Sequence, residues 1–389
     1  MQAWRCSVWH RVAALQVLYD SFMSEESKTG PSADPGTSAP SILFELSRFV
    51  LPILIGLAAA WSLQHWLVLP ELGYPGGVRR TIALSESLAD GVLDGDDEIA
   101  VIISNSAGVE GVDASIVQAA APEGWKIYNF SINGSNQIEI RMLADTLAEA
   151  GADLVIWLMR PNLLVPPRPM HPDVLHAWGF AGFAEGSEWL AAPWIDEASL
   201  EQLTAGPWET SLHFRRRWLD EINYSMRRSM RTGIRTPDDR DWVSPYNLEL
   251  ELEGPKLDRH LGDIASITTR AMPKLEATGA GSGRAFITEM AEDFEHRDAT
   301  LGIIIAPTHP TLDEQFRPLE ETLQVFLEDL SRKTGILVGN TGGLLTTDQY
   351  ADAIHPDAEG RVVLSEWIGR WLPSPDSLKS HQAEEAETR

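Results

Sequence analysis

Asp352 and His355, near the end of the chain, have the types and the spacing of the acid and base of a nucleophilic enzyme. An aspartate three residues before a histidine can reach the imidazole from the same loop, where it selects the useful tautomer and stabilises the charged ring. A histidine held in this way can take the proton of a serine hydroxyl, which is otherwise a poor nucleophile at neutral pH. The pair therefore predicts acyl transfer through an acyl-serine, if a serine far upstream meets it. The alternative is a loop that only opens an ordinary helix.

The elements that must position such a serine are indicated by short apolar runs alternating with helical segments beyond residue 95. This pattern predicts a three-layer α/β/α sandwich with a mostly parallel central sheet. In such sheets function gathers in the loops at the carboxyl ends of the strands, so the serine is expected there. The predicted strands are 98–104, 125–131, 152–159, 300–307 and 336–340, and the predicted helices are 112–121, 136–151, 284–295 and 319–335.

Three of these loops carry residues suited to an active site. Ser106 follows the first strand at a tight turn into a helix, and Asn162 follows the third strand. Gly134 follows the second strand, where a glycine lets a backbone N–H approach a ligand closely. Ser, Gly and Asn are also the commonest turn residues, so each of the three taken alone is better explained as part of a turn.

Taken together, the serine turn, the glycine, the asparagine and the D-x-x-H-P motif resemble the SGNH (GDSL-type) hydrolase family over roughly residues 96–372. The resemblance implies an SGNH/flavodoxin-like fold and an enzyme that acts on ester bonds without a cofactor or a metal. It implies these site residues: Ser106, Asp352 and His355 as catalytic residues, and Ser106, Gly134 and Asn162 as donors of the oxyanion hole.

The first motif departs from the family pattern at two positions. Ser104 stands where the family usually has glycine, and Asn105 stands where it often has aspartate. Ser104 is therefore an alternative nucleophile to Ser106.

Composition excludes other classes of function. A formal net charge of -26 disfavours nucleic-acid binding, because such proteins neutralise phosphates with an excess of Lys and Arg. The single cysteine excludes an intramolecular disulfide and a thiolate metal cluster. His171, His176 and His309 show no metal-ligand spacing.

Residues 49–69 contain no charged side chain and are long enough to cross a bilayer core of about 30 Å as a helix. We therefore expect a single-pass protein of the cell membrane, although the positive charges on the two sides do not decide its orientation. The expected layout is a flexible tail (1–46), a transmembrane helix (47–70), a linker (71–95), two parts of an SGNH-like domain (96–162 and 298–373) separated by a helical insertion (163–297), and an acidic tail (374–389).

This layout also resembles membrane-anchored proteins that modify envelope polymers, which implies an extracytoplasmic domain, a polysaccharide or other acylated polymer as substrate, and a multi-span membrane acyltransferase as partner. Two alternatives stay open: an anchored esterase or lipase that uses water, and a non-catalytic envelope-assembly protein with the same fold. The insertion contains a basic stretch, 213–236, which suits either an anionic ligand or a solvated helix face.

Overall fold

The computed structural model describes residues 77–95, 97–168, 170, 174–175, 178–179, 194–204, 240–245, 251–275, 279 and 281–380, and a few residues between 50 and 59. The chain divides into two compact units, Met1–Leu72 and Gly73–Arg389. Within the described residues, no helix has the length and apolar character needed to cross a membrane. The tail 1–46, most of the predicted span and the basic stretch 213–236 lie outside the described residues.

The core of the second unit is a five-stranded sheet in the order β2-β1-β3-β4-β5. All four ladders are parallel, which is the arrangement expected when helices connect successive strands. The order 2-1-3-4-5 is one of the common doubly wound α/β arrangements. The strands are β1 (Glu98–Ile103), β2 (Trp125–Asn129), β3 (Leu154–Met159), β4 (Thr300–Ile305) and β5 (Leu337–Asn340), each within a predicted strand.

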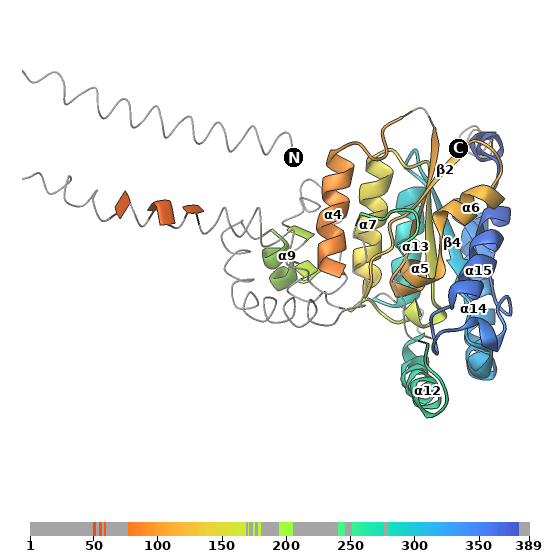
Figure 1. Ribbon diagram of the computed structural model, residues 1–389. Helices are drawn as coiled ribbons and strands as arrows, with labels where there is room; N and C mark the ends of the chain where they lie inside the picture. Colours follow the sequence, from red (N-terminus) through yellow and green to blue (C-terminus); the bar gives the residue numbers. More distant parts are fainter. Residues whose placement is uncertain are drawn as a thin grey trace, which may run out of the picture. The chain divides into compact units, whose positions relative to one another are not determined.

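Helices cover both faces of this sheet, so the predicted three-layer architecture is confirmed (Figure 1). One face is covered by α4 (Gly77–Ala89), α7 (Gln137–Glu149), α13 (Gly283–Phe294) and α14 (Asp313–Thr334), and the other by α6 (Ala114–Ala120) and α15 (Ala358–Trp371). Two further helices come from the segment between β3 and β4, namely α9 (Glu197–Leu203) and α12 (Pro255–Leu275).

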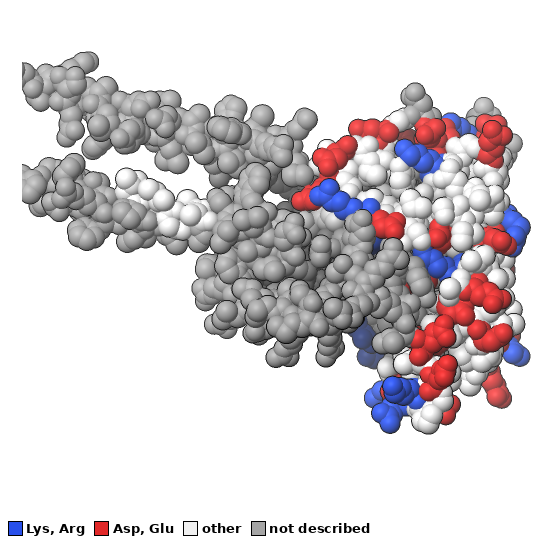
Figure 2. Space-filling model, viewed as in Figure 1, with Lys and Arg blue, Asp and Glu red and all other residues white. Residues whose placement is uncertain are grey.

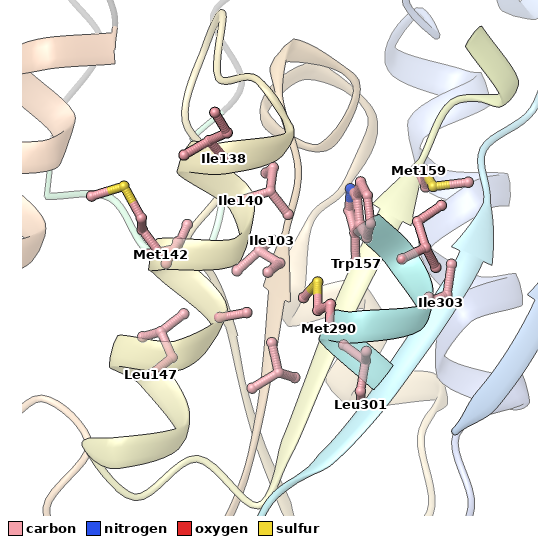
Figure 3. Packing of buried hydrophobic residues seen from close by; sticks show 14 of the residues in the cluster. Ile103, Ile138, Ile140, Met142, Leu147, Trp157, Met159, Met290, Leu301 and Ile303 are labelled. Carbon is pink, nitrogen blue, oxygen red and sulfur yellow. The ribbon is translucent and has the colours of Figure 1, made fainter. Parts of the chain in front are cut away.

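The central strand β3 explains why two cores form. All six of its residues are buried, as its continuous apolar sequence predicts for a strand covered on both faces. Alternate side chains point to opposite faces, so Trp157 enters one core and Ile156 the other. Figure 3 shows the first core, in which α7 and α13 pack against the sheet through Ile138, Ile140, Met142, Leu147, Met290, Ile103, Trp157, Met159, Leu301 and Ile303.

Residues 77–89 of the predicted linker 71–95 are not a linker, because they form α4. Leu84 in this helix is fully buried in the first core. Arg80 donates to the backbone oxygens of Asn129 (2.9 Å), the last residue of β2, and of Ser131 (2.6 Å) just after it. Its guanidinium lies 4.5 Å from the ring centre of Trp242. Helix α4 is therefore part of the α/β domain.

Two other predicted domain boundaries differ from those in the structure. The predicted insertion 163–297 includes α13, whose Phe286 and Met290 are buried against the sheet, so this helix is the crossover between β3 and β4. The predicted acidic tail begins with residues that belong to the domain: Leu378 is buried, and Lys379 forms an ion pair with Glu98 of β1. Acidic side chains are widespread over the face seen in Figure 2, in keeping with the net charge of -26.

Candidate active site

The segment 350–356, called here the Asp–His loop, lies between β5 and α15. Its ends pair as a short antiparallel bridge between Tyr350 and Pro356, and the N–H of Ala351 donates to the oxygen of His355 over 3.0 Å. Asp352 accepts at Oδ1 from the N–H groups of Ile354 and His355, both at 2.8 Å. Its Oδ2 lies 2.8 Å from Nδ1 of His355. The loop therefore holds the carboxylate and the imidazole in one fixed geometry, as the spacing predicts.

The ionisation of Asp352 determines what His355 can do. Burial alone would raise the pKa of Asp352, but the hydrogen bond and charge of His355 and the two backbone N–H groups lower it to about 2. The carboxylate is therefore ionised at neutral pH and accepts the Nδ1 proton, which leaves Nε2 of the neutral ring as an acceptor. This Nε2 is buried and has no hydrogen-bond partner in the described residues. Such a group is costly unless it serves a function.

Ser106 is the first residue of α5 (Ser106–Gly111), directly after the carboxyl end of β1. Asn105 caps this helix by accepting from the N–H of Ala107 at 3.0 Å. Ser106 is half-buried, and no hydrogen bond of its hydroxyl is found within the described part of the chain. Ser104, by contrast, is 1% exposed and donates to the oxygen of Leu158 at 2.7 Å. The geometry thus leaves the hydroxyl of Ser106 available and commits that of Ser104 to the core.

Gly108 explains how the chain turns so sharply from β1 into α5. A Cβ atom at this position would lie 2.6 Å from the Cβ of Ser104 and also overlap Ser131. Only glycine allows α5 to pack this close to the ends of β1 and β2.

The Asp–His loop lies beside both α5 and the end of β3. Arg160, the residue after β3, donates from Nη2 to the oxygen of Ile354 at 2.9 Å. On the α5 side, a Cβ added to Gly111 would lie 3.4 Å from Cγ of Pro356, the residue after His355. Because β1 and β3 are neighbours in the sheet, Ser106, Asn162 and the Asp–His loop gather at the same edge.

The three predicted oxyanion donors follow β1, β2 and β3. As the first residue of α5, Ser106 has an N–H without an acceptor in its helix. Gly134 lies in an exposed turn with φ of 79°, a conformation that favours glycine. Asn162 lies in a short 3-10 helix, η3 (Pro161–Leu164), and its side chain makes no hydrogen bond within the described residues. Each predicted donor is therefore at the expected strand end.

The structure adds residues that sequence reasoning missed. His260 of α12 has Nδ1 4.0 Å from Oδ2 of Asp352, the same oxygen that lies 2.8 Å from Nδ1 of His355. Arg160 contacts the Asp–His loop through the backbone oxygen of Ile354. His260 lies in the predicted insertion and belongs to no motif, because its closeness to Asp352 depends on how α12 packs. Among the described residues, no group of His, Cys, Asp and Glu side chains is arranged to hold a metal.

Helix α7, which follows the Gly134 turn, begins with a capping box. The acid in this box makes the free energy of unfolding depend on pH. Glu139 accepts from the N–H of Asn136 (2.9 Å) and from Nε1 of Trp178 (3.4 Å), yet burial raises its pKa to about 7. Because this value exceeds the ordinary 4.5, the associated stability is present below about pH 4.5 and is lost as the pH rises through 7. Glu139→Gln keeps the box without the charge. Between pH 5 and 9 we expect the unfolding free energy of the wild type to fall by about 3 kcal/mol more than that of the variant.

Urea unfolding at pH 5, 7 and 9 measures this difference. Glu292→Gln, at an exposed position of α13, is the matched control and should follow the wild type at every pH. Parallel pH curves for the wild type and Glu139→Gln would contradict the assignment.

Comparison with known proteins adds little to this geometry. No protein-family model matches the chain, and no curated protein matches it either. Among solved structures, the chain is similar to Est24, a carbohydrate acetylesterase from Sinorhizobium meliloti, with 11% identity, coverage of 73% of this chain and 99% of that chain, and a TM-score of 0.30. At this TM-score the likeness supports no conclusion about activity.

Proposed function

We propose that the α/β domain is a serine-dependent enzyme that acts on ester bonds by acyl transfer. The observation that carries the proposal is the buried Nε2 of His355, which has no hydrogen-bond partner among the described residues and whose ring is held through Nδ1 by Asp352. His355 lies in the Asp–His loop, beside the helix α5 that begins with Ser106. A purely structural Asp–His pair would have no need of a second, unsatisfied nitrogen at the carboxyl edge of a parallel sheet.

In the proposed reaction, Nε2 of His355 takes the proton of Ser106 as Oγ attacks the ester carbonyl. The carbonyl oxygen becomes an oxyanion, which the N–H groups of Ser106 and Gly134 and the side-chain amide of Asn162 stabilise. The tetrahedral intermediate then collapses, the bond to the alcohol oxygen breaks, and His355 returns the proton to that oxygen. This step leaves an acyl-serine and a free alcohol.

The second half of the reaction decides between hydrolysis and transfer. His355 removes a proton from water or from an acceptor hydroxyl, which attacks the acyl-serine, and the proton then passes to Oγ of Ser106. The charge-free segment 49–69 and the resemblance to SGNH hydrolases support the more specific proposal. In that proposal the protein is anchored in the cell membrane, its domain is extracytoplasmic, and it transfers acetyl groups to or from an envelope polysaccharide with a multi-span acyltransferase as partner. An anchored esterase that uses water is the alternative.

A fluorophosphonate probe tests the common core of these proposals on the full chain. We expect one covalent adduct, located by peptide mass spectrometry on Ser106, because an activated serine hydroxyl displaces the leaving group of the probe. Prior incubation with p-nitrophenyl acetate should compete with labelling. An adduct on another serine would move the nucleophile, and an unlabelled wild-type protein would favour the non-catalytic assembly role. Adding an oligosaccharide acceptor to the ester assay then separates transfer from hydrolysis by product mass.

A further inference from the structure

A small pocket lies beside the Asp–His loop, and of its polar residues only Asn162 has a part in the reaction proposed above. Its polar wall contains Arg160 and Asn162 after β3 and His309 after β4, and Ile354 of the loop closes one side. Ile264 of α12 and Phe316 of α14 supply apolar walls. The pocket encloses about 30 Å³, which is space for about two water-sized groups.

His309 presents an unused donor to this pocket. Its side chain is 1% exposed, and Nδ1 accepts from the N–H of Thr311 at 3.2 Å, so the ring proton of the neutral form is on Nε2. Burial lowers the pKa of His309 more than the nearby Asp313 and Asp352 raise it, which favours that neutral form. Nε2 is buried and has no partner in the described residues. A buried N–H of this kind calls for an acceptor oxygen.

Arg160 adds a positive charge with few partners. Among the described residues its guanidinium makes one hydrogen bond, to the oxygen of Ile354, and no ion pair. Burial lowers its pKa to about 10, although Asp352 and Tyr350 act in the opposite direction, so the group is still charged at neutral pH. Asp352, the carboxylate whose charge acts on Arg160, already accepts from His355 and from two backbone N–H groups. Arg160 is half-buried, and a cation taken partly out of water is costly unless it is paired.

We propose that this pocket binds a carboxylate carried by the ester substrate. Arg160 donates a charge-assisted hydrogen bond to one carboxylate oxygen and His309 Nε2–H donates to the other, a pairing that suits the planar geometry of both groups. Ile264 and Phe316 exclude water and contact the carbon chain next to the carboxylate. The inference rests on the proposed function, because it places the carboxylate a short distance from the bond that is cleaved. The carboxylate belongs either to the acyl part or to the alcohol part of the ester.

Matched pairs of esters test the proposal on the full chain and distinguish the two sources. Mono-p-nitrophenyl succinate against p-nitrophenyl acetate places a carboxylate on the acyl part, and 4-carboxyphenyl acetate against phenyl acetate places it on the alcohol part. We expect kcat/KM to be higher for the charged member of one pair than for its uncharged partner. Arg160→Met should reduce the ratio of these two kcat/KM values by about 10- to 100-fold. Arg160→Lys should retain part of the preference, since it keeps the charge but loses the fork of donors.

The ratio of kcat/KM between the charged and the uncharged ester separates two roles of Arg160, which are binding of the carboxylate and support of the Asp–His loop. Arg160 also supports the Asp–His loop through Ile354, and a loss of that support slows both members of a pair equally. Arg370→Met removes the same charge from an exposed site on α15, where Arg370 pairs with Glu366, and should leave both ratios unchanged. No preference in either wild-type pair, or an equal loss for both members in Arg160→Met, would overturn the proposal.

A binding measurement keeps this inference separate from the proposed function. Isothermal titration of the full chain with acetate and with monomethyl succinate should show binding of one or both. Arg160→Met should abolish that binding, as should His309→Phe, which keeps an aromatic ring beside Tyr350 but removes the donor. Binding that depends on Arg160 in a protein without esterase activity would sustain the pocket and reject the proposed reaction. Binding that is insensitive to both variants, or that occurs with inorganic phosphate alone, would reject the carboxylate pocket.

Discussion

Replacing Ser106 with alanine should reduce kcat for ester cleavage by about 10,000-fold or more, because the variant lacks the hydroxyl that forms the proposed acyl-enzyme. The substitution removes one oxygen from a half-buried position at the start of α5. It leaves the capping contact of Asn105 with Ala107 in place, so we expect little change in the unfolding free energy. The measurement is a steady-state assay with p-nitrophenyl acetate, together with urea unfolding of the same sample.

Ser104→Ala is the matched control, since it removes a hydroxyl two residues away. Ser104 donates to Leu158 in the core, so its loss should cost about 1 kcal/mol of stability and leave the chemical step largely intact. The opposite pattern, with Ser104→Ala inactive and Ser106→Ala active, would make Ser104 the nucleophile. Equal activity in all three proteins would show that the cleavage does not use a serine of this turn.

The strands and the Asp–His pair could be predicted from sequence because their signals are local. A strand such as β3 is covered on both faces and therefore reads as an uninterrupted apolar run. Asp352 and His355 are three residues apart, so one tight loop brings them together whatever surrounds it. Asn105 likewise marks the start of α5 through a contact only two residues long.

The features that the sequence analysis missed depend on contacts between distant segments of the chain. Helix α4 has apolar residues at helical spacing, including Leu84, and this period was a usable signal that α4 is more than a linker. Arg160, His260 and His309 carry no such signal, since they come from three separate segments. Arg160 and His309 share a pocket, and His260 approaches Asp352, only when α12 and the strand ends are packed. An arginine after a strand is common in sequences. That Arg160 makes a single side-chain hydrogen bond among the described residues is seen only in the folded structure.

Asp352→Asn should lower kcat by about 1,000- to 10,000-fold while leaving the hydroxyl of Ser106 in place. The amide oxygen of the new side chain can still accept from the backbone N–H groups of Ile354 and His355, so the loop should keep its shape. The amide nitrogen would then face Nδ1 of His355 and donate to it. The ring proton moves to Nε2, and the nitrogen that must accept the serine proton no longer has a free lone pair.

Two measurements distinguish this loss from a simple loss of folding. The ¹⁵N resonances of His355 should report a proton on Nδ1 in the wild type and on Nε2 in Asp352→Asn. The folded-state pKa of Asp352, about 2, lies below its ordinary 3.8, so the carboxylate stabilises the fold above pH 4 and this contribution is lost as the pH falls toward 2. Over that range the wild type should therefore lose about 2 kcal/mol more stability than Asp352→Asn. A variant that keeps the Nδ1 proton and the wild-type rate would show that Asp352 only closes the loop ahead of α15, and that His355 does not act as the base.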